Sequence, residues 1–324
     1  MIMKKFVLMV VALMGLTAAN AQDVVAVYNE ASKAVEAKNY AKAAELYESV
    51  IIDGSEEESD AALQCVANAK ANLPVMYQRM GTSAASAAMK ATDVKVKDAK
   101  FAEAIANLEK AIAKAKSFRN TRTATSAANA LGKVYQVQGG TYFNAGDYAK
   151  AAEIFAKGYA ADNKNTAMAM NLAESYFKQD KYAEGMKVCS EVAALPAGQK
   201  YDAAIAEAKA KMAQYTNNKV AAMQQANDFD GIIAMAATIA DQALAQRVLV
   251  QAYFAKKDYD KVIELGEAAA ALQTDDEGKS AIYFNLGSAY NAKEQKAKAV
   301  ETLKKVTAEP YATPAKAAVA ELSK

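Results

Sequence analysis

The chain has 324 residues, with 39 Lys and Arg against 37 Asp and Glu and no His, so its formal net charge is +2. This balance, with both signs interspersed, argues against a nucleic-acid-binding protein, and the lack of His removes the commonest general base and zinc ligand. Hydrophobic residues make up 53% of the chain, whereas there are only 14 Gly and 4 Pro. Such a composition favours helix along nearly the whole length, and no stretch alternates as a half-buried strand would. An all-α fold is expected.

The first 21 residues have the features of an export signal. Lys4 and Lys5 precede a short apolar run, and the tripeptide Ala-Asn-Ala at 19–21 provides the small residues that signal peptidase selects. The run is about half as long as the roughly 20 apolar residues of a membrane-spanning helix. We therefore expect a cleaved signal over 1–21 and no membrane span afterwards. The mature chain, 22–324, should be soluble and either periplasmic or secreted.

A short motif recurs along the chain. It consists of a polar residue, usually an aromatic residue, and then a small or aliphatic residue three places later. Its copies begin at Asn39, Lys100, Asp147, Lys181, Asp228, Asp258 and, in a degenerate form, Gln295. We interpret each copy as a tight turn followed by a second helix, in which the aromatic ring closes the turn and the small residue lets the two helices approach.

A matching first helix precedes several copies. It carries a Leu, a small or aliphatic residue and a Tyr four places after the Leu, at 172–176, 249–253 and 286–290. This spacing puts both large side chains on one helical face. Downstream, Pro196 and Pro310 are expected to end second helices.

In these features the chain resembles the tetratricopeptide repeat (TPR) family. Residues 280–313 carry the best match, and residues 132–165 and 166–199 follow each other at the 34-residue period of the family. The resemblance implies a right-handed α-solenoid of about seven TPR-like helix-turn-helix units.

The sequence departs from the family pattern in three places, one of which is the unit at 213–242, where the first-helix signature is missing. The first two copies of the motif begin 61 residues apart, and the turn at Tyr148 comes late after its first helix. Lengthened or inserted helices are therefore expected around 58–95 and 122–146.

The resemblance also implies a binding surface, because first helices of the family line a concave groove. The family pattern places nine residues of this chain at groove-facing positions: Tyr28, Phe143, Met170, Asn171, Phe177, Arg247, Phe254, Phe284 and Asn285. They predict an apolar, partly aromatic groove for an extended or helical peptide. The alternative is that the rings pack between adjacent first helices. The lysine and asparagine set that clamps a terminal carboxylate in some relatives is missing.

No catalytic constellation or phosphate-binding loop is found, so we expect a protein that is not an enzyme and that needs no cofactor or metal. The leading hypothesis is a protein–protein interaction scaffold or adaptor of the bacterial envelope, which binds a protein or peptide in the groove. The alternative is a binding protein for a glycan or other non-protein ligand, against which the absence of Trp counts. Cys65 and Cys189 are expected to be buried free thiols, because stacked units lie further apart than a disulfide spans.

Cleavage after Ala21 predicts that the mature protein begins at Gln22. Intact-mass analysis of the exported protein should show the loss of residues 1–21. Full-length chain in the cytoplasm would contradict both the cleavage and the export.

Overall fold

The computed structural model describes residues 24–56, 59–239 and 241–324, so the expected signal over 1–21 lies outside the described residues. In the described part the chain forms α-helices joined by short connections, with a single 3-10 turn at Gly54–Glu56 and no strand. The all-α prediction is confirmed. None of these helices is long and apolar enough to cross a membrane.

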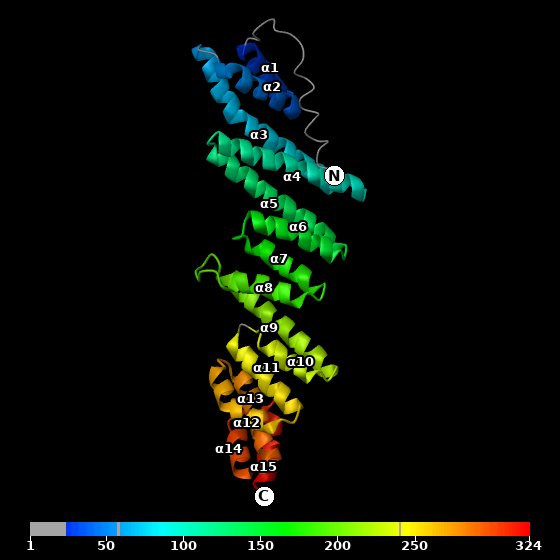
Figure 1. Cartoon of the computed structure of the whole chain (residues 1–324), viewed down its shortest axis with the longest axis vertical. Helices are drawn as coiled ribbons and strands as arrows, with labels where there is room; N and C mark the ends of the chain where they lie inside the picture. Colours follow the sequence, from blue (N-terminus) through cyan, green and yellow to red (C-terminus); the bar gives the residue numbers. More distant parts are fainter. Residues whose placement is uncertain (1–23, 57–58, 240) are drawn as a thin grey trace. The chain divides into compact units, whose positions relative to one another are not determined.

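Two compact units divide the chain between Met168 and Ala169. The first unit contains α1 (Val24–Glu36), α2 (Tyr40–Asp53), α3 (Asp60–Lys90), α4 (Val94–Ser117), α5 (Thr121–Asn144) and α6 (Tyr148–Ala161) (Figure 1). The second contains most of α7 (Thr166–Phe177), then α8 (Tyr182–Ala193), α9 (Asp202–Gln225), α10 (Phe229–Ala236), α11 (Gln242–Ala255), α12 (Tyr259–Leu272), α13 (Asp276–Ala292), α14 (Lys296–Leu303) and α15 (Ala312–Leu322). Within each unit, helices pack mainly on their neighbours in the chain, as in a helical solenoid.

One turn conformation recurs at seven of the described helix junctions. Each turn has a residue in the left-handed backbone region, at Lys38, Arg119, Gly146, Asp180, Asn227, Lys257 and Glu294. The next residue donates its backbone N–H to a carbonyl five places back, for example Asp258 to Tyr253 at 2.9 Å. This bond satisfies a carbonyl that the end of the helix would otherwise leave free. The left-handed conformation costs a residue other than glycine about 1 kcal/mol or more, so six such positions mark a strongly specified turn.

The residue after the left-handed one caps the helix that follows, which is the second helix of a pair at every turn except that at Asn120, where it is the first helix α5. The capping side chain accepts a hydrogen bond from the backbone N–H three residues later at Asn39, Asn120, Asp147, Asp228 and Asp258. Lys181 and Gln295 hold the same position without such a bond. In five of the seven turns, one hydrogen bond therefore closes the end of the preceding helix and another caps the start of the next helix.

The turn predicted at Lys100 is wrong, because Lys100 lies inside α4. That helix begins after Asp93, whose carboxylate accepts a hydrogen bond from the N–H of Val96 at 2.9 Å. Lysine cannot accept a capping bond, and the spacing of Phe101 and Ala104 suits the buried face of a long helix equally well. The connection into α4 therefore lies at 91–93, and the left-handed turn at Arg119 belongs to the next junction, between α4 and α5, where no aromatic residue follows the cap.

The helices form seven pairs, α1/α2 to α13/α14, followed by α15. In some pairs the first helix is much longer than the second. Helix α3 has 31 residues and α5 and α9 have 24 each, whereas α6 has 14 and α10 has 8. Some first helices therefore extend well beyond the helix that packs on them. Both cysteines, Cys65 and Cys189, are buried and form no disulfide, as expected.

Two adjacent glycines of α5 give a test of the packing between α5 and α6. A Cβ atom on Gly139 would lie 2.5 Å from the ring of Phe155, whereas a Cβ on Gly140 would meet nothing within 4 Å. Gly139→Ala should therefore lower the free energy of unfolding by about 1–3 kcal/mol. Gly140→Ala should raise it by about 0.5–1 kcal/mol, because alanine favours the helix. Chemical denaturation measures the change in the free energy of unfolding for each variant. Equal changes in the two variants would contradict this packing.

Candidate binding surfaces

The nine predicted groove residues lie on the first helices α1, α5, α7, α11 and α13. Met170, Phe177 and Asn285 are buried, with exposed fractions of 5%, 6% and 9%. The ring of Phe177 stacks on that of Tyr215 at 3.8 Å and 10°. Phe177 therefore packs between helices, and together with Tyr215 it also lines a hollow of about 300 Å³. Tyr28, Phe143, Asn171, Arg247, Phe254 and Phe284 are partly exposed.

Three of the predicted rings share a structural role at the turns. Each ends, or nearly ends, a first helix and contacts the Tyr that begins the second helix. The pairs are Phe143–Tyr148 at 5.1 Å, Phe177–Tyr182 at 6.3 Å and Phe254–Tyr259 at 5.7 Å between ring centroids. Their equivalence in the sequence thus reflects the closing of a turn. Phe284 likewise contacts Tyr311, ahead of α15, at 5.8 Å.

A half-buried polar cluster joins α7 and α9. The carboxylate of Glu174 accepts hydrogen bonds from Lys211 at 2.6 Å and from the hydroxyl of Tyr215 at 2.7 Å. Burial opposes ionisation of Glu174, but the two donors outweigh it and lower the pKa of this carboxyl group. Burial and the bond to Glu174 raise the pKa of Tyr215. Since these groups satisfy each other, the cluster connects two helices and leaves no reactive acid or base.

Two further clusters in the first unit repeat this arrangement of a tyrosine, a carboxylate and a lysine. They are Tyr77–Glu48–Lys114 and Tyr142–Asp98–Lys150. Nowhere in the described residues do His, Cys, Asp or Glu side chains gather in a group that would hold a metal ion.

An apolar hollow lies between the first helices α3 and α5. It has a volume of about 170 Å³ and is lined by Thr82, Ala85, Met89, Phe101, Ala130, Lys133, Val134 and Val137. Met89 and Val137 are 58% and 40% exposed although both are apolar. We call this the α3/α5 hollow. The sequence analysis missed it because α3 lies in the range that it treated only as an insertion.

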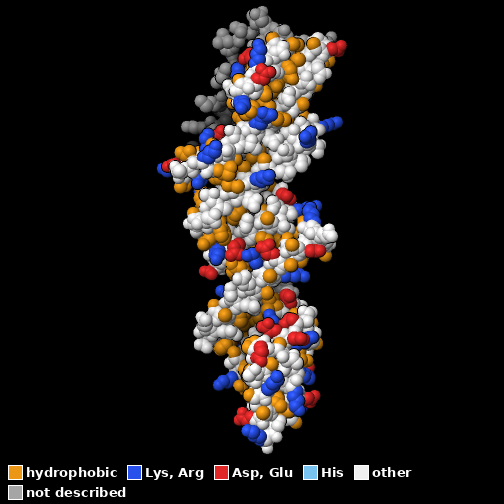
Figure 2. Space-filling view, turned by 180° about the vertical axis from the view of Figure 1, so that it is seen from behind, with side chains coloured by type: hydrophobic (Ala, Val, Ile, Leu, Met, Phe, Trp, Pro, Cys, Tyr) orange, Lys and Arg blue, Asp and Glu red, His pale blue; other side chains and the backbone are white. Residues whose placement is uncertain are grey.

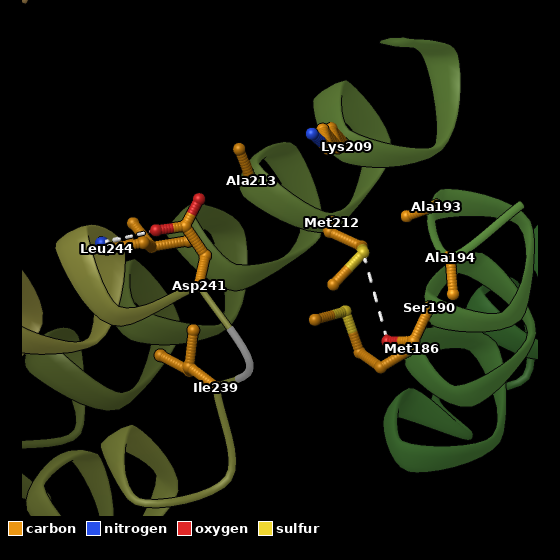
Figure 3. A pocket seen from close by; sticks show the side chains of 10 residues that line it. All are labelled: Met186, Ser190, Ala193, Ala194, Lys209, Met212, Ala213, Ile239, Asp241 and Leu244. Atoms are coloured by element: carbon orange, nitrogen blue, oxygen red, sulfur yellow. Dashed lines mark hydrogen bonds between the residues drawn. The ribbon is translucent and has the colours of Figure 1, made fainter. Parts of the chain in front are cut away.

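A second hollow, in the second unit, lies between α8, α9 and the start of α11 (Figure 3). Its volume is about 390 Å³; Met186 from α8 and Met212 from α9 face each other across it. Lys209 and Asp241 are exposed at its rim. Its origin is the short α10, which leaves the first half of α9 uncovered. We call it the α8/α9 hollow; none of the predicted groove residues lines it.

Phe177 and Phe254 occupy the same place in two turns but differ in burial, and so they form a matched pair. Phe177→Ala should lower the free energy of unfolding by about 3–5 kcal/mol, because it removes a buried ring that is stacked on Tyr215. Phe254→Ala should cost less, since its ring is partly exposed. Denaturation followed by circular dichroism compares the two. Equal losses would show that Phe177 is no more part of the core than Phe254.

Comparison with known proteins gives a family match in the middle of the chain, where residues 142–212 fit a model described as tetratricopeptide repeat. No curated protein matches the sequence. Three solved structures are similar. The TPR domain of P58(IPK) is 10% identical, covers 93% of this chain and 97% of its own, and has a TM-score of 0.32. Yeast Tom70 is 16% identical. The match covers 96% of this chain and 66% of the Tom70 chain, with a TM-score of 0.33.

The third, the APC/C hetero-tetramer Cut9–Hcn1, is 14% identical. The match covers 87% of this chain and 52% of that chain, with a TM-score of 0.30. TM-scores this low carry no argument about function. The matched residues 142–212 run from the end of α5 into α9, and the same turn recurs in the helix pairs on either side. The chain thus contains tetratricopeptide repeats, which the family model matches over residues 142–212.

Proposed function

We propose that this protein is a non-catalytic scaffold or adaptor of the bacterial envelope, which binds a protein or peptide through its first-helix surface. TPR units in general form scaffolds for protein–protein interaction. The location in the envelope rests on the export features of residues 1–21. The binding surface rests on the α3/α5 hollow.

The observation that carries the proposal is the exposure of Met89 and Val137 beside this hollow. Large apolar side chains that lie together at a surface mark interaction sites more often than chance. Methionine is unbranched and flexible, so it adapts to different apolar partners. A volume of about 170 Å³ is below the range of most small-molecule sites, roughly 300–1,000 Å³. The hollow therefore suits an apolar side chain of a bound protein segment.

A glycan ligand is the alternative, and the lining of the hollow disfavours it. Sugars need hydrogen-bonding groups and an open aromatic face. The one aromatic residue in the lining, Phe101, is 1% exposed, and the chain has no Trp.

A pair of double variants tests the surface. Met89→Gln with Val137→Gln makes the α3/α5 hollow polar. Both positions are exposed in the wild type, so no polar group is buried by the change. Ile52→Gln with Leu63→Gln is the matched control, because these residues are also exposed, at 69% and 48%, and do not line the hollow. Each protein is cross-linked in the envelope fraction of a bacterium that exports it, and captured proteins are quantified by mass spectrometry.

We expect a protein recovered with wild type and control to fall about tenfold with the hollow variant, as for loss of interface anchors. Equal recovery with all three would contradict the proposal for this surface. A glycan array run beside the capture detects the alternative ligand class. Ala194→Phe, which fills the α8/α9 hollow, and Ala226→Phe, at an equivalent helix end, then show whether that hollow binds instead.

A further inference from the structure

A long stretch of the first unit contains no acidic residue. Residues 110–146 carry six basic side chains and no Asp or Glu, in a chain whose 39 basic and 37 acidic residues nearly balance. Residues 61–92 also lack Asp and Glu but carry only three basic residues, and the face shown in Figure 2 bears side chains of both signs. The six are Lys110, Lys114, Lys116, Arg119, Arg122 and Lys133.

Only two of the six have a partner nearby in the described structure. Lys114 forms an ion pair with Glu48 at 2.9 Å, and Lys110 lies over the ring of Tyr77 at 5.5 Å. Lys116, Arg119, Arg122 and Lys133 are exposed and form no ion pair with a described residue. Their charge is therefore available to an outside ligand.

Three of these four cations line a groove. Two hollows of about 670 and 380 Å³ adjoin along α5 and share Ile112, Lys116 and Ala128. Lys116 and Arg119 come from the end of α4, and Lys133 comes from α5. The groove exists because α5 has 24 residues and α6 only 14, so α6 leaves the first half of α5 uncovered. We call it the basic groove.

The remaining lining suits a polypeptide. Asn129 and Gln136 present exposed amide groups, each of which can both donate to and accept from a peptide backbone. At Gly132 no atom would lie within 4 Å of an added Cβ, so a ligand backbone can approach closely. Asp162 is the one acidic residue in the lining, and its carboxylate already accepts the N–H of Lys164 at 3.1 Å.

We propose that the basic groove binds an extended acidic segment of a partner protein. Three cations against one carboxylate give the charge complementarity, and the amides fit a peptide backbone. A nucleic acid fits less well, because no aromatic residue lines the groove for bases to stack on. Lys133 also lines the α3/α5 hollow, but Lys116 and Arg119 line only the basic groove, between α4 and α6.

Fluorescence anisotropy with a short labelled peptide of alternating Glu and Ser tests this inference on the full mature chain. The same peptide with Gln in place of Glu is the neutral probe, and a short oligothymidylate is the nucleic-acid probe. We expect the Glu peptide alone to bind, and to bind more weakly as salt is added. Tighter binding of the oligothymidylate, or equal binding of the two peptides, would overturn the proposal.

A matched pair of triple variants locates the site. Lys116→Gln, Arg119→Gln and Lys133→Gln remove the charges of the groove. The control changes Lys90, in the last turn of α3, Lys38, in a left-handed turn, and Lys70, within a helix, to Gln. It therefore matches the charge removed and the structural position of each residue, and all six side chains are exposed.

The groove variant should lose affinity for the Glu peptide by about tenfold, and the control by less than about twofold. Equal losses in the two would show general attraction to a positive surface and would overturn the site. Hydrogen exchange of the wild type with the Glu peptide is independent of any variant. It should show protection at the end of α4 and in the first half of α5, and protection elsewhere would contradict the proposal.

Discussion

The turn between the two helices of a pair is the constraint on which the rest of the structure depends. A left-handed residue ends the first helix, and a capping side chain starts the second one immediately afterwards. This leaves no freedom in the direction of the second helix, so it must fold back on the first. The small buried residues Ala43, Ala151 and Ala299 lie where that return brings two helices together, and all are fully buried. The packing of six of the seven pairs follows from such a turn, whereas α3 and α4 are joined through the extended residue Ala91.

Since the turns fix direction and not length, the pairs differ in how far their helices extend. Where a long first helix extends beyond the second helix of its pair, part of its surface stays uncovered. Both the α8/α9 hollow and the basic groove arise at such places, on α9 and α5. A regular repeat therefore builds the scaffold, and the irregular lengths create the surfaces that distinguish this chain from another TPR protein.

The all-α fold and most turns were predictable, because capping residues and aromatic spacing act locally. The turn at Lys100 was mispredicted for the same reason. A local pattern does not distinguish the start of a helix from the buried face of a long one, as Phe101 shows. The predicted groove residues were chosen by family position, which cannot tell a ring such as Phe177 that is covered by Tyr215 from one that is free. The hollows depend on helix ends, which short-range patterns define least well. The acid-free stretch 110–146 was visible in the sequence, but the net charge of the whole chain conceals it.

The burial of the two cysteines has a consequence for how this protein matures. Burial raises the pKa of the Cys189 thiol to about 11, so at neutral pH only about one molecule in ten thousand carries the reactive thiolate. Cys65 and Cys189 also belong to different units. The chain can thus reach its native state without a disulfide-forming catalyst and keep it when the redox potential changes. Its folding is set by the helix-joining turns and by helix packing.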